Sequence, residues 1–397
     1  MIIQFRNNFI PDSLSFNSQK RIIMLDNFSK SKIIDDYFDP GEITQYRKRF
    51  EFYAKSRFYR RLMNGRAFLN RLVQTIAILK HNTYLFPHLV KNFLRLGQGG
   101  AFRSLEIAVD YNCNSKCEQC SCRLAYDPSR TRLSLDQFKD AIDQAMALGG
   151  FQFNITGGEP LLQLDEVLAL TSYIHGRGGY VHLCSNGLLM NEEILTKLVA
   201  AGLNSLEMGL DSVLPSVHDD NRQEEGFNKI MAVIDLAHKF KLPVILNTII
   251  THFKIENGDM LALYKLAKAK KVLLQITPPC VTGAWSDQDE ILLDEKETLY
   301  FWWLMSFPGV RTDMYSSLTR TRCPAAREKI GLQPYGDVVS CSLIQLTFGN
   351  IKDESLAVIR DRMLQDEYYQ NITFCLPAFD RQFIKDRLAN NKEESCH

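Results

Sequence analysis

Between residues 105 and 277 the chain alternates short apolar stretches with stretches of helical period, and this alternation limits the folds open to it. Six stretches have the length and apolar content of buried strands: 105–110, 151–156, 180–186, 205–211, 243–251 and 272–277. Helical patterns follow the first five, at 133–148, 164–176, 191–201, 226–240 and 256–270. Strands that alternate with helices form parallel βαβ units. Six units are too few for a closed barrel of eight strands, so we expect an α/β fold built on a partial parallel (β/α)6 barrel.

The remaining sequence adds a part on each side of the barrel. Residues 1–102 form a basic, mostly helical N-terminal extension that ends in the flexible stretch GQGGAF at 97–102. The barrel occupies residues 103–290. Residues 291–397 begin with an aromatic-rich helix at 294–306 and continue as a small cysteine-bearing domain.

Positive charge concentrates in the N-terminal extension. Residues 46–95 hold twelve Lys or Arg and one acid, Glu51, although the net charge of the whole chain is only +1. The segment is either a solvated helical face or a surface for an anionic partner: a membrane interface, a lipid-linked molecule, an acidic peptide or an acyl carrier. No nucleic-acid-binding motif accompanies the charge, so we expect no nucleic acid partner. We expect Gly65 to break this helical pattern and Pro87 to begin another helix.

The N-terminus has no apolar stretch followed by a small-residue cleavage site, and no run of about 18 apolar residues occurs anywhere. We therefore expect a cytoplasmic protein. In a reducing compartment, clustered cysteines bind metals or take part in catalysis more often than they form disulfides.

Four of the ten cysteines lie in one short loop. The stretch DYNCNSKCEQCSC (110–122) follows the first strand and spaces Cys113, Cys117 and Cys120 as C-x3-C-x2-C, with Cys122 close behind. Active sites of parallel α/β folds gather at the carboxyl ends of the strands. Three thiolates can hold three corners of a [4Fe–4S] cube and leave one iron open, whereas all four could hold a structural zinc ion. The loop by itself leaves both interpretations open.

The loop and four later motifs resemble the radical S-adenosylmethionine (radical SAM) superfamily over roughly residues 103–285. The cysteine spacing is the family's signature, and the later motifs lie at successive strand ends. They are TGGEPLL (156–162), CSNG (184–187), GLDS (209–212) and HDDNRQEEGFNK (218–229), which are similar to the family's GGEP, TNG, SLDG or SLDS, and HDxxRG runs.

The resemblance implies a [4Fe–4S] cluster on Cys113, Cys117 and Cys120 whose open iron binds SAM. A reduced flavodoxin or ferredoxin would supply the electron that cleaves SAM to a 5′-deoxyadenosyl radical, and this radical would abstract hydrogen from a substrate. No catalytic residue beyond the cluster ligands is assigned. Carboxylates suit the SAM ammonium and a guanidinium suits its carboxylate. The SAM-contacting residues that the resemblance implies are Gly157, Gly158, Glu159, Ser185, Asn186, Asp211 and Arg222.

The sequence departs from the family pattern at three positions. Ser185 replaces the threonine of TNG, and Gly209 replaces the serine often found before the LD pair. Gln119 stands where the family usually has an aromatic residue beside the adenine of SAM. The adenine contact is therefore altered, or a neighbour such as Tyr126 substitutes for it.

The tail resembles the auxiliary-cluster domain called SPASM, or its shorter form, twitch. Cys323-x12-Gly336-x4-Cys341 is followed by Cys375 and Cys396, and Gly336 with Asp337 predicts a hairpin turn that brings the first two cysteines together. The resemblance implies a second [4Fe–4S] cluster on Cys323, Cys341 and Cys375. Cys396 is a possible fourth ligand, with Cys280 or Cys122 as the substitutes.

The substrate is left open by the sequence. Relatives with such tails modify ribosomal peptides or act on small molecules or lipids, and residues 1–100 lack a clear peptide-binding winged-helix pattern. The alternative from a different class is a non-catalytic zinc-binding interaction protein that uses its basic segment to bind a partner.

Overall fold

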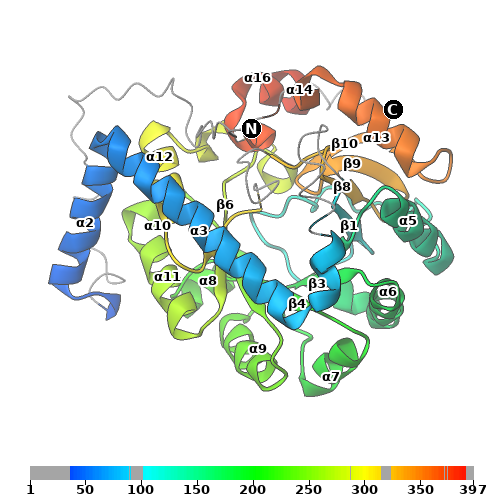
Figure 1. Cartoon of the computed structure of the whole chain (residues 1–397), viewed down its shortest axis with the longest axis horizontal. Helices are drawn as coiled ribbons and strands as arrows, with labels where there is room; N and C mark the ends of the chain where they lie inside the picture. The colour runs from blue at the N-terminus through cyan, green and yellow to red at the C-terminus, as the bar shows by residue number, and fades with distance from the viewer. Residues whose placement is uncertain are drawn as a thin grey trace.

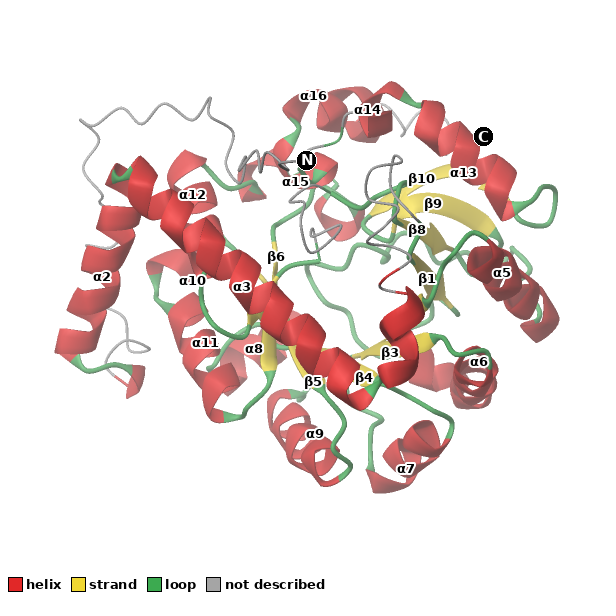
Figure 2. Cartoon of the chain, viewed as in Figure 1, coloured by secondary structure: helices red, strands yellow, loops and turns green. Residues whose placement is uncertain are grey.

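The computed structural model describes residues 36–88, 90, 102–286, 288–313, 323–370, 372 and 374–389. A curled sheet of ten strands forms its centre, in the order β10-β9-β8-β1-β2-β3-β4-β5-β6-β7. Helices pack around the outside of the curl, as Figures 1 and 2 show. The partial barrel predicted from the sequence is confirmed, and it carries additional strands at both edges.

The predicted strands and helices all form close to their expected bounds. Six parallel strands make the barrel: β1 Ser104–Ala108, β2 Gln152–Thr156, β3 Tyr180–Ser185, β4 Ser205–Gly209, β5 Val244–Ile249 and β6 Leu273–Thr277. The helices between them are α5 Leu135–Ala147, α6 Leu164–Gly176, α7 Glu192–Ala200, α9 Phe227–Lys239, and α10 His252–Glu256 with α11 Asp259–Ala269. The helix expected over 256–270 is α11, and α10 is an additional short helix before it; Gly258, whose φ is 82°, separates the two.

Local sequence signals explain why these elements begin where they do. Helix α5 starts with a capping box, in which Ser134 and Gln137 each bond the backbone of the other. The buried face of α5 packs against the sheet through Phe138, Ile142 and other apolar side chains. Burying a side chain of this size stabilises the fold by about 1.5–3 kcal/mol.

Shorter elements lie mainly at the strand ends. They are η3 Thr83–Leu85, η4 Pro160–Gln163, α8 Pro215–Arg222, η5 Gly283–Trp285 and η6 Asp289–Ile291. Helix α8 follows β4 and ends at Gln223, whose φ of 55° is left-handed.

The N-terminal extension consists of two long helices, α2 Pro40–Lys55 and α3 Arg57–His81. The break lies at Ser56, whose extended backbone and side-chain bond to Tyr59 N begin α3. The prediction that Gly65 breaks the helix is wrong: Gly65 lies inside α3 on an exposed face, where a missing side chain costs little packing. Pro87 lies near the start of a short helical segment at 86–88, as predicted.

Helix α3 crosses the barrel at the amino-terminal ends of the strands, as Figure 1 shows. The Asn70 amide donates to the carbonyl of Phe307 (2.8 Å) and to that of Val310 (3.0 Å), the first residue of β7 Val310–Arg311. At the other end of α3, Asn82 accepts a bond from Asn204, which precedes β4. No described helix is long and apolar enough to cross a membrane.

The tail continues the barrel sheet. After α12 Glu295–Leu304 and β7, strand β8 Lys329–Leu332 pairs in parallel with β1, and β9 Asp337–Cys341 returns antiparallel through the turn at Gly336, whose φ is 96°. The predicted hairpin is therefore present. The remaining elements are β10 Ile344–Asn350, α13 Leu356–Gln365, α14 Glu367–Gln370, α15 Leu376–Phe379, α16 Arg381–Phe383 and η7 Ile384–Ala389. The domain limits 1–102, 103–290 and 291–397 stay predictions, and most of the 97–102 joint lies outside the described residues.

Candidate functional site

The cysteine loop follows β1 and is held from both sides by loops at neighbouring strand ends. On one side, the backbone N–H groups of Lys116 and Glu118 donate to carbonyls at the end of α8, at 3.3 and 3.2 Å. On the other side, Ala284 N donates to the Cys120 carbonyl at 3.0 Å. The segment PPCVTGAW (278–285), which follows β6, thus supports the loop. Cys113 is exposed, and Cys117 and Cys120 are half-buried, so a ligand can reach their thiols.

The loop thiols differ in acidity. Burial raises the pKa of Cys113 to about 11. Burial also raises the pKa of Cys117, although the Arg222 guanidinium opposes it. A bond from the Cys122 thiol, whose sulfur lies 3.6 Å away, lowers the pKa of Cys120 to about 6. Cys120 is therefore the loop thiol that ionises first.

The spacing of the loop sulfurs does not suit a single metal ion. A metal ion needs several ligand atoms from His, Cys, Asp or Glu close together. In the part of the chain that the structure describes, only His182, Cys184 and Glu207 bring three of these ligand atoms within 4.8 Å of one another. Thiolates that share one zinc ion lie about 2.3 Å from it, hence within less than 5 Å of each other. No three loop cysteines meet that condition in this conformation. This spacing argues against the alternative of a structural zinc ion on the loop.

Gly157 and Gly158 allow the end of β2 to approach the start of the cysteine loop. A Cβ on Gly157, whose φ is 141°, would lie 2.1 Å from the Asp110 carbonyl, and one on Gly158 would lie 2.2 Å from the Asn112 carbonyl. Gly158 N donates to Asp110 O at 2.7 Å. The two glycines are expected to let the backbone approach a ligand. In the structure they also let it approach the backbone of the cysteine loop.

Glu159 is fully buried and links β2 to β3. One carboxylate oxygen accepts from Ser185 Oγ (2.9 Å) and Leu161 N (3.0 Å), and the other accepts from Asn186 N (2.7 Å). Burial raises the pKa of Glu159, and these three donors oppose the shift. The Asn186 side chain donates to Asn114 and Ser115 in the cysteine loop, at 2.8 and 3.0 Å. Glu159 thus positions Ser185 and Asn186 against the loop.

Asp211 and Arg222 form a buried ion pair beside the loop. Arg222 donates from Nε and Nη2 to the two oxygens of Asp211, at 2.6 and 3.2 Å, and its Nη1 lies 3.7 Å from Cys117 Sγ. Burial by itself would raise the pKa of Asp211, but Arg222 and Lys254 hold it well below its ordinary value. Gln119, which stands where the family usually has an aromatic residue, donates to the same carboxylate at 3.0 Å. Tyr126, the neighbour named as a substitute for the adenine contact, is 49% exposed.

Gly209, the other departure, lies directly against Arg222. A Cβ at residue 209 would lie 2.1 Å from Nη2 of Arg222. The Arg222 guanidinium can lie at this place because residue 209 is a glycine and not a serine.

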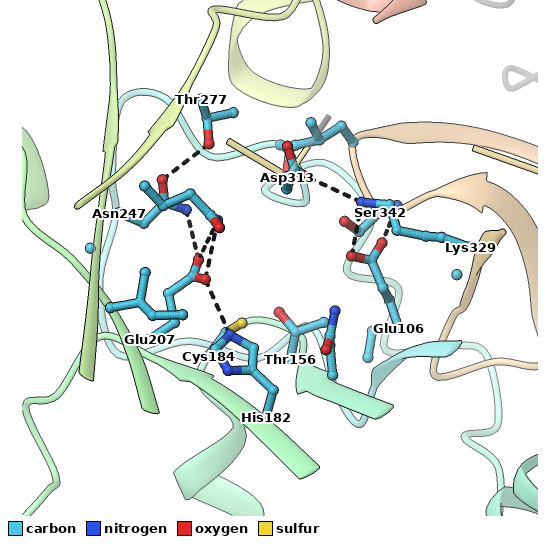
Figure 3. A pocket seen from close by; sticks show the side chains of 18 of the residues that line it. Glu106, Thr156, His182, Cys184, Glu207, Asn247, Thr277, Asp313, Lys329 and Ser342 are labelled. Carbon is cyan, nitrogen blue, oxygen red and sulfur yellow. Dashed lines mark hydrogen bonds and ion pairs between the residues drawn. The ribbon is translucent and has the colours of Figure 1, made fainter. Parts of the chain in front are cut away.

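The site opens into a cavity of about 610 Å³ that extends through the barrel. Loop cysteines line one end of it, and Arg71, Gln74 and Ile78 of α3 line the other. Polar side chains on the strands cover the wall between the two ends, as Figure 3 shows. The cavity therefore has the thiol loop at the carboxyl ends of the strands and α3 as its floor.

One polar group on the wall centres on Glu207 of β4. Its carboxylate accepts from Asn247 (2.8 Å), from Gln275 (3.1 and 3.2 Å), and from His182 Nε2 (3.1 Å). Cys184 lies next to this group, and burial raises the pKa of its thiol well above the ordinary value, with Glu207 adding to the shift. All the donors to this carboxylate are amides or an imidazole, and none is a lysine or arginine.

A second polar group lies across the cavity. Lys329 of β8 bonds Glu106 of β1 at 3.2 Å and Asp313 at 3.0 Å, and Ser342 N donates to Glu106 at 3.1 Å (Figure 3). Burial by itself would lower the pKa of Lys329, but Asp313 and the Cys341 thiol beside it raise it well above its ordinary value. The tail thus contributes a lysine to the barrel wall through the pairing of β8 with β1.

These wall residues are not among the site residues predicted from the sequence. The signal was present, because His182 and Cys184, and likewise Gln275 and Thr277, alternate with apolar residues along strands that are otherwise buried. On a barrel strand such alternation places polar side chains on the inside.

The tail cysteines gather around a fourth cysteine from the barrel. Cys323, Cys341 and Cys375 are all buried. Cys280, in the loop after β6, is buried as well, and its bond to the Cys375 thiol is the main reason why the pKa of Cys375 is raised. Burial and then Cys375 raise the pKa of Cys323. The structure thus brings Cys280 to this group and leaves Cys122 beside Cys120. Cys396 lies outside the described residues.

Comparison with known proteins agrees with this geometry. Residues 109–267 match the sequence profile of the Radical SAM superfamily. The chain is 29% identical to AdoMet-dependent heme synthase of Methanosarcina barkeri over 48% of this chain and 54% of that protein. It is 24% identical to PqqA peptide cyclase of Rhizobium meliloti over 63% of this chain and 71% of the cyclase. Streptococcus suis SuiB bound to the precursor peptide SuiA has the same fold, with a TM-score of 0.54 and 15% identity over 72% of this chain and 69% of SuiB.

The curled parallel sheet with a C-x3-C-x2-C loop after its first strand defines a SAM-dependent iron–sulfur class of protein. By this match, residues 109–267 form a radical SAM domain. The chain spans about half the length of the heme synthase and somewhat more of the cyclase.

Proposed function

We propose that the chain holds a [4Fe–4S] cluster on Cys113, Cys117 and Cys120 and cleaves SAM reductively. When bound, the cluster supplies the electron that splits SAM to a 5′-deoxyadenosyl radical, which takes a hydrogen atom from the substrate. One observation carries the proposal: the thiol loop, the Gly157–Gly158 turn and the Asp211–Arg222 pair converge on one end of the barrel cavity. A reduced flavodoxin or ferredoxin in the cytoplasm would be the electron donor.

The residues present fit such a cluster. The three thiols lie on a loop that solvent reaches, and their sulfurs are spread too widely for a single ion. Arg222 lies 3.7 Å from Cys117 Sγ, and a neighbouring cation favours the thiolate that binds iron.

For SAM, we assign direct contacts and positioning roles separately. Gly157, Gly158, Ser185 and Asn186 offer backbone and small polar groups beside the loop. Arg222 retains its guanidinium next to the thiols and can bind the SAM carboxylate, while Asp211 holds that guanidinium in place. Glu159 has no exposed surface, so its part is to position Ser185 and Asn186.

We also propose an auxiliary [4Fe–4S] cluster on Cys280, Cys323, Cys341 and Cys375, which makes the tail a twitch-like domain. All four are cysteines, the natural ligands of such clusters, and four ligands complete a cube. All four are buried, and Lys329 beside Cys341 opposes the effect of burial on the pKa of that thiol, which favours the thiolate that binds iron.

A peptide is the substrate class we favour. A relative that aligns over 63% of this chain is named as a peptide cyclase. The cavity wall supports a substrate with polar groups, because the donors to Glu207 are two amides and an imidazole, with no lysine or arginine among them, and its carboxylate can pair with a cationic group such as an amine. A small-molecule substrate is the second candidate, since the heme synthase aligns over 192 residues of this chain.

The test of the activity combines iron content with SAM cleavage under dithionite. We expect the triple variant Cys113→Ala/Cys117→Ala/Cys120→Ala to lose the iron of one cluster and all formation of 5′-deoxyadenosine. The matched control is Cys184→Ala, which removes a thiol from the cavity wall without touching the loop and should keep both iron and cleavage. Continued formation of 5′-deoxyadenosine by the triple variant would contradict the assignment.

A further inference from the structure

Helix α3 carries a continuous apolar stripe on its exposed side. Five large apolar side chains are more than half exposed: Phe58 (78%), Leu62 (52%), Leu69 (57%), Val73 (57%) and Ile76 (55%). At about 100° per residue these positions fall within an arc of about 60° on the helix. We call these five residues the apolar face of α3.

The opposite side of α3 already has its partners. Met63, Ala67 and Arg71 are buried, and the Asn70 side chain bonds the segment before β7. Gln74 and Ile78 line the floor of the cavity. The apolar face is therefore not the side that holds α3 on the barrel, and the described fold gives it no packing role.

Single exposed apolar side chains are common on protein surfaces, but a contiguous stripe marks a site of interaction. The face extends from residue 58 to residue 76, about 27 Å along the helix axis. Phe253 of α10 and Val358 of α13 are also exposed, but they lie on other helices, apart from this face.

The charge of α3 indicates what covers this face. The helix has no acidic residue, and its basic residues are Arg57, Arg60, Arg61, Arg66, Arg71 and Lys80. Arg61 and Arg66 are exposed and project on the two sides of the apolar face. An apolar stripe bordered by cations is the pattern of a helix that lies in the interface of an anionic bilayer.

A second copy of the chain fits less well. Two apolar faces in contact would bring the basic borders of both helices together without an acid on either helix to neutralise them, and like charges in close contact oppose association. Anionic phospholipids instead supply both the apolar layer and the negative charge. The six cations rule out the alternative that α3 crosses the bilayer, in agreement with the absence of a spanning helix among the described residues.

We propose that the apolar face of α3 docks the protein on an anionic phospholipid surface, with the helix lying in the plane of the membrane. Since α3 forms the floor of the cavity, this orientation turns the floor toward the lipid and the cysteine loop away from it. The loop then faces the aqueous side, where an electron donor can reach it. The proposal goes beyond the SAM-cleavage activity and does not depend on it.

The experiment is co-sedimentation of the cluster-loaded full chain with vesicles. We expect binding to vesicles of phosphatidylcholine with 30 mol% phosphatidylglycerol and much weaker binding to phosphatidylcholine alone. The variant Phe58→Ser/Leu69→Ser/Ile76→Ser should lower the partition coefficient by about tenfold or more, because the inserted area is lost. Its matched control is Phe253→Ser/Val358→Ser, which removes apolar side chains that are 60% and 50% exposed elsewhere and should bind like the wild type.

A second variant tests the charge. Arg61→Gln/Arg66→Gln should bind anionic vesicles more weakly and show a flatter dependence on salt concentration, because fewer cations meet the lipid phosphates. Absence of wild-type binding at low salt, or equal binding by the triple serine variant, overturns the proposal. It is also overturned if sedimentation velocity shows that the wild type self-associates through this face and the triple variant does not, with no vesicle binding by either.

Discussion

At residue 209, a side chain and the Arg222 guanidinium cannot occupy their places together. A Cβ on Gly209 would lie 2.1 Å from Nη2 and 2.7 Å from Cζ of Arg222. Arg222 in turn makes a paired bond to Asp211 and reaches Cys117. The glycine that departs from the family pattern therefore determines where the guanidinium lies, and with it the side chain that we assign to the SAM carboxylate.

We accordingly expect Gly209→Ser to displace Arg222 and to weaken SAM binding by about tenfold, since loss of one charge-assisted bond costs about 1.5–3 kcal/mol and about 1.4 kcal/mol is a factor of ten. Anaerobic isothermal titration of the cluster-loaded protein with SAM measures the change. Gly176→Ser is the control, because no atom lies within 4 Å of a Cβ there. Equal SAM affinities of the Gly209 variant and the wild type would show that the guanidinium does not bind SAM.

At the level of elements, the sequence predicts the barrel well and its surroundings less well. The six strands and their helices follow from apolar length and helical period, and the hairpin at Gly336 follows from its turn residues. The break in the N-terminal helix could not be located, because Gly65 is tolerated on an exposed face while Ser56 acts through its capping bond. The parallel pairing of β8 with β1 joins residues more than 220 positions apart, and no local pattern encodes such a contact.

The same limit applies to the candidate site. The loop cysteines and the glycine turns are recognisable because chemistry fixes their type and spacing. Lys329 is not, since it reaches Glu106 only after β8 has paired with β1. The sequence offers Cys280 only as a substitute for Cys396, because Cys280 lies in a barrel loop and only the folded tail brings Cys375 to it.

His252 links α10 to α12, and this contact makes the stability of the fold depend on pH in a direction that can be predicted. His252 bonds Glu297 through Nδ1 (2.6 Å) and the Glu290 carbonyl through Nε2 (2.8 Å). Burial by itself lowers the pKa of His252, but these two acceptors raise it above its ordinary value of about 6.5. Because the folded-state pKa is the higher one, the stabilisation is complete below about pH 6.5 and is lost as pH rises through the folded-state value.

The variant His252→Gln should therefore lose more stability at pH 6 than at pH 8.5, measured as the thermal unfolding midpoint relative to the wild type. The effect should stay below about 1 kcal/mol, because the imidazole is 41% exposed and solvent screens the pair. Lys197→Gln serves as the control, since its pair with Glu193 does not titrate in this range. A loss that is the same at both pH values would mean that the imidazolium adds nothing to the α10–α12 contact.

On the scale of the whole molecule, barrel and tail form one sheet and share one cavity wall. Strand β8 closes the β1 edge of the barrel and supplies Lys329, while the loop after β6 supplies Cys280 to the tail cysteines. The N-terminal extension closes the floor. All three parts of the chain therefore contribute residues to the cavity.

This shared construction makes Cys280 the decisive residue for the second cluster. If Cys280, Cys323, Cys341 and Cys375 hold it, the anaerobically reconstituted chain carries about eight iron atoms, four per cube. Cys280→Ala, although it lies in the barrel, should then lower the iron content as much as Cys375→Ala in the tail. The Cys113/Cys117/Cys120 triple variant should lose an equal and independent amount. Iron and acid-labile sulfide analysis gives the counts, with Cys122→Ala and Cys396→Ala as controls. Full iron content in the Cys280 variant together with a loss of iron in the Cys396 variant would contradict this assignment. It would show that the fourth ligand is Cys396 and that the barrel does not bind the second cluster.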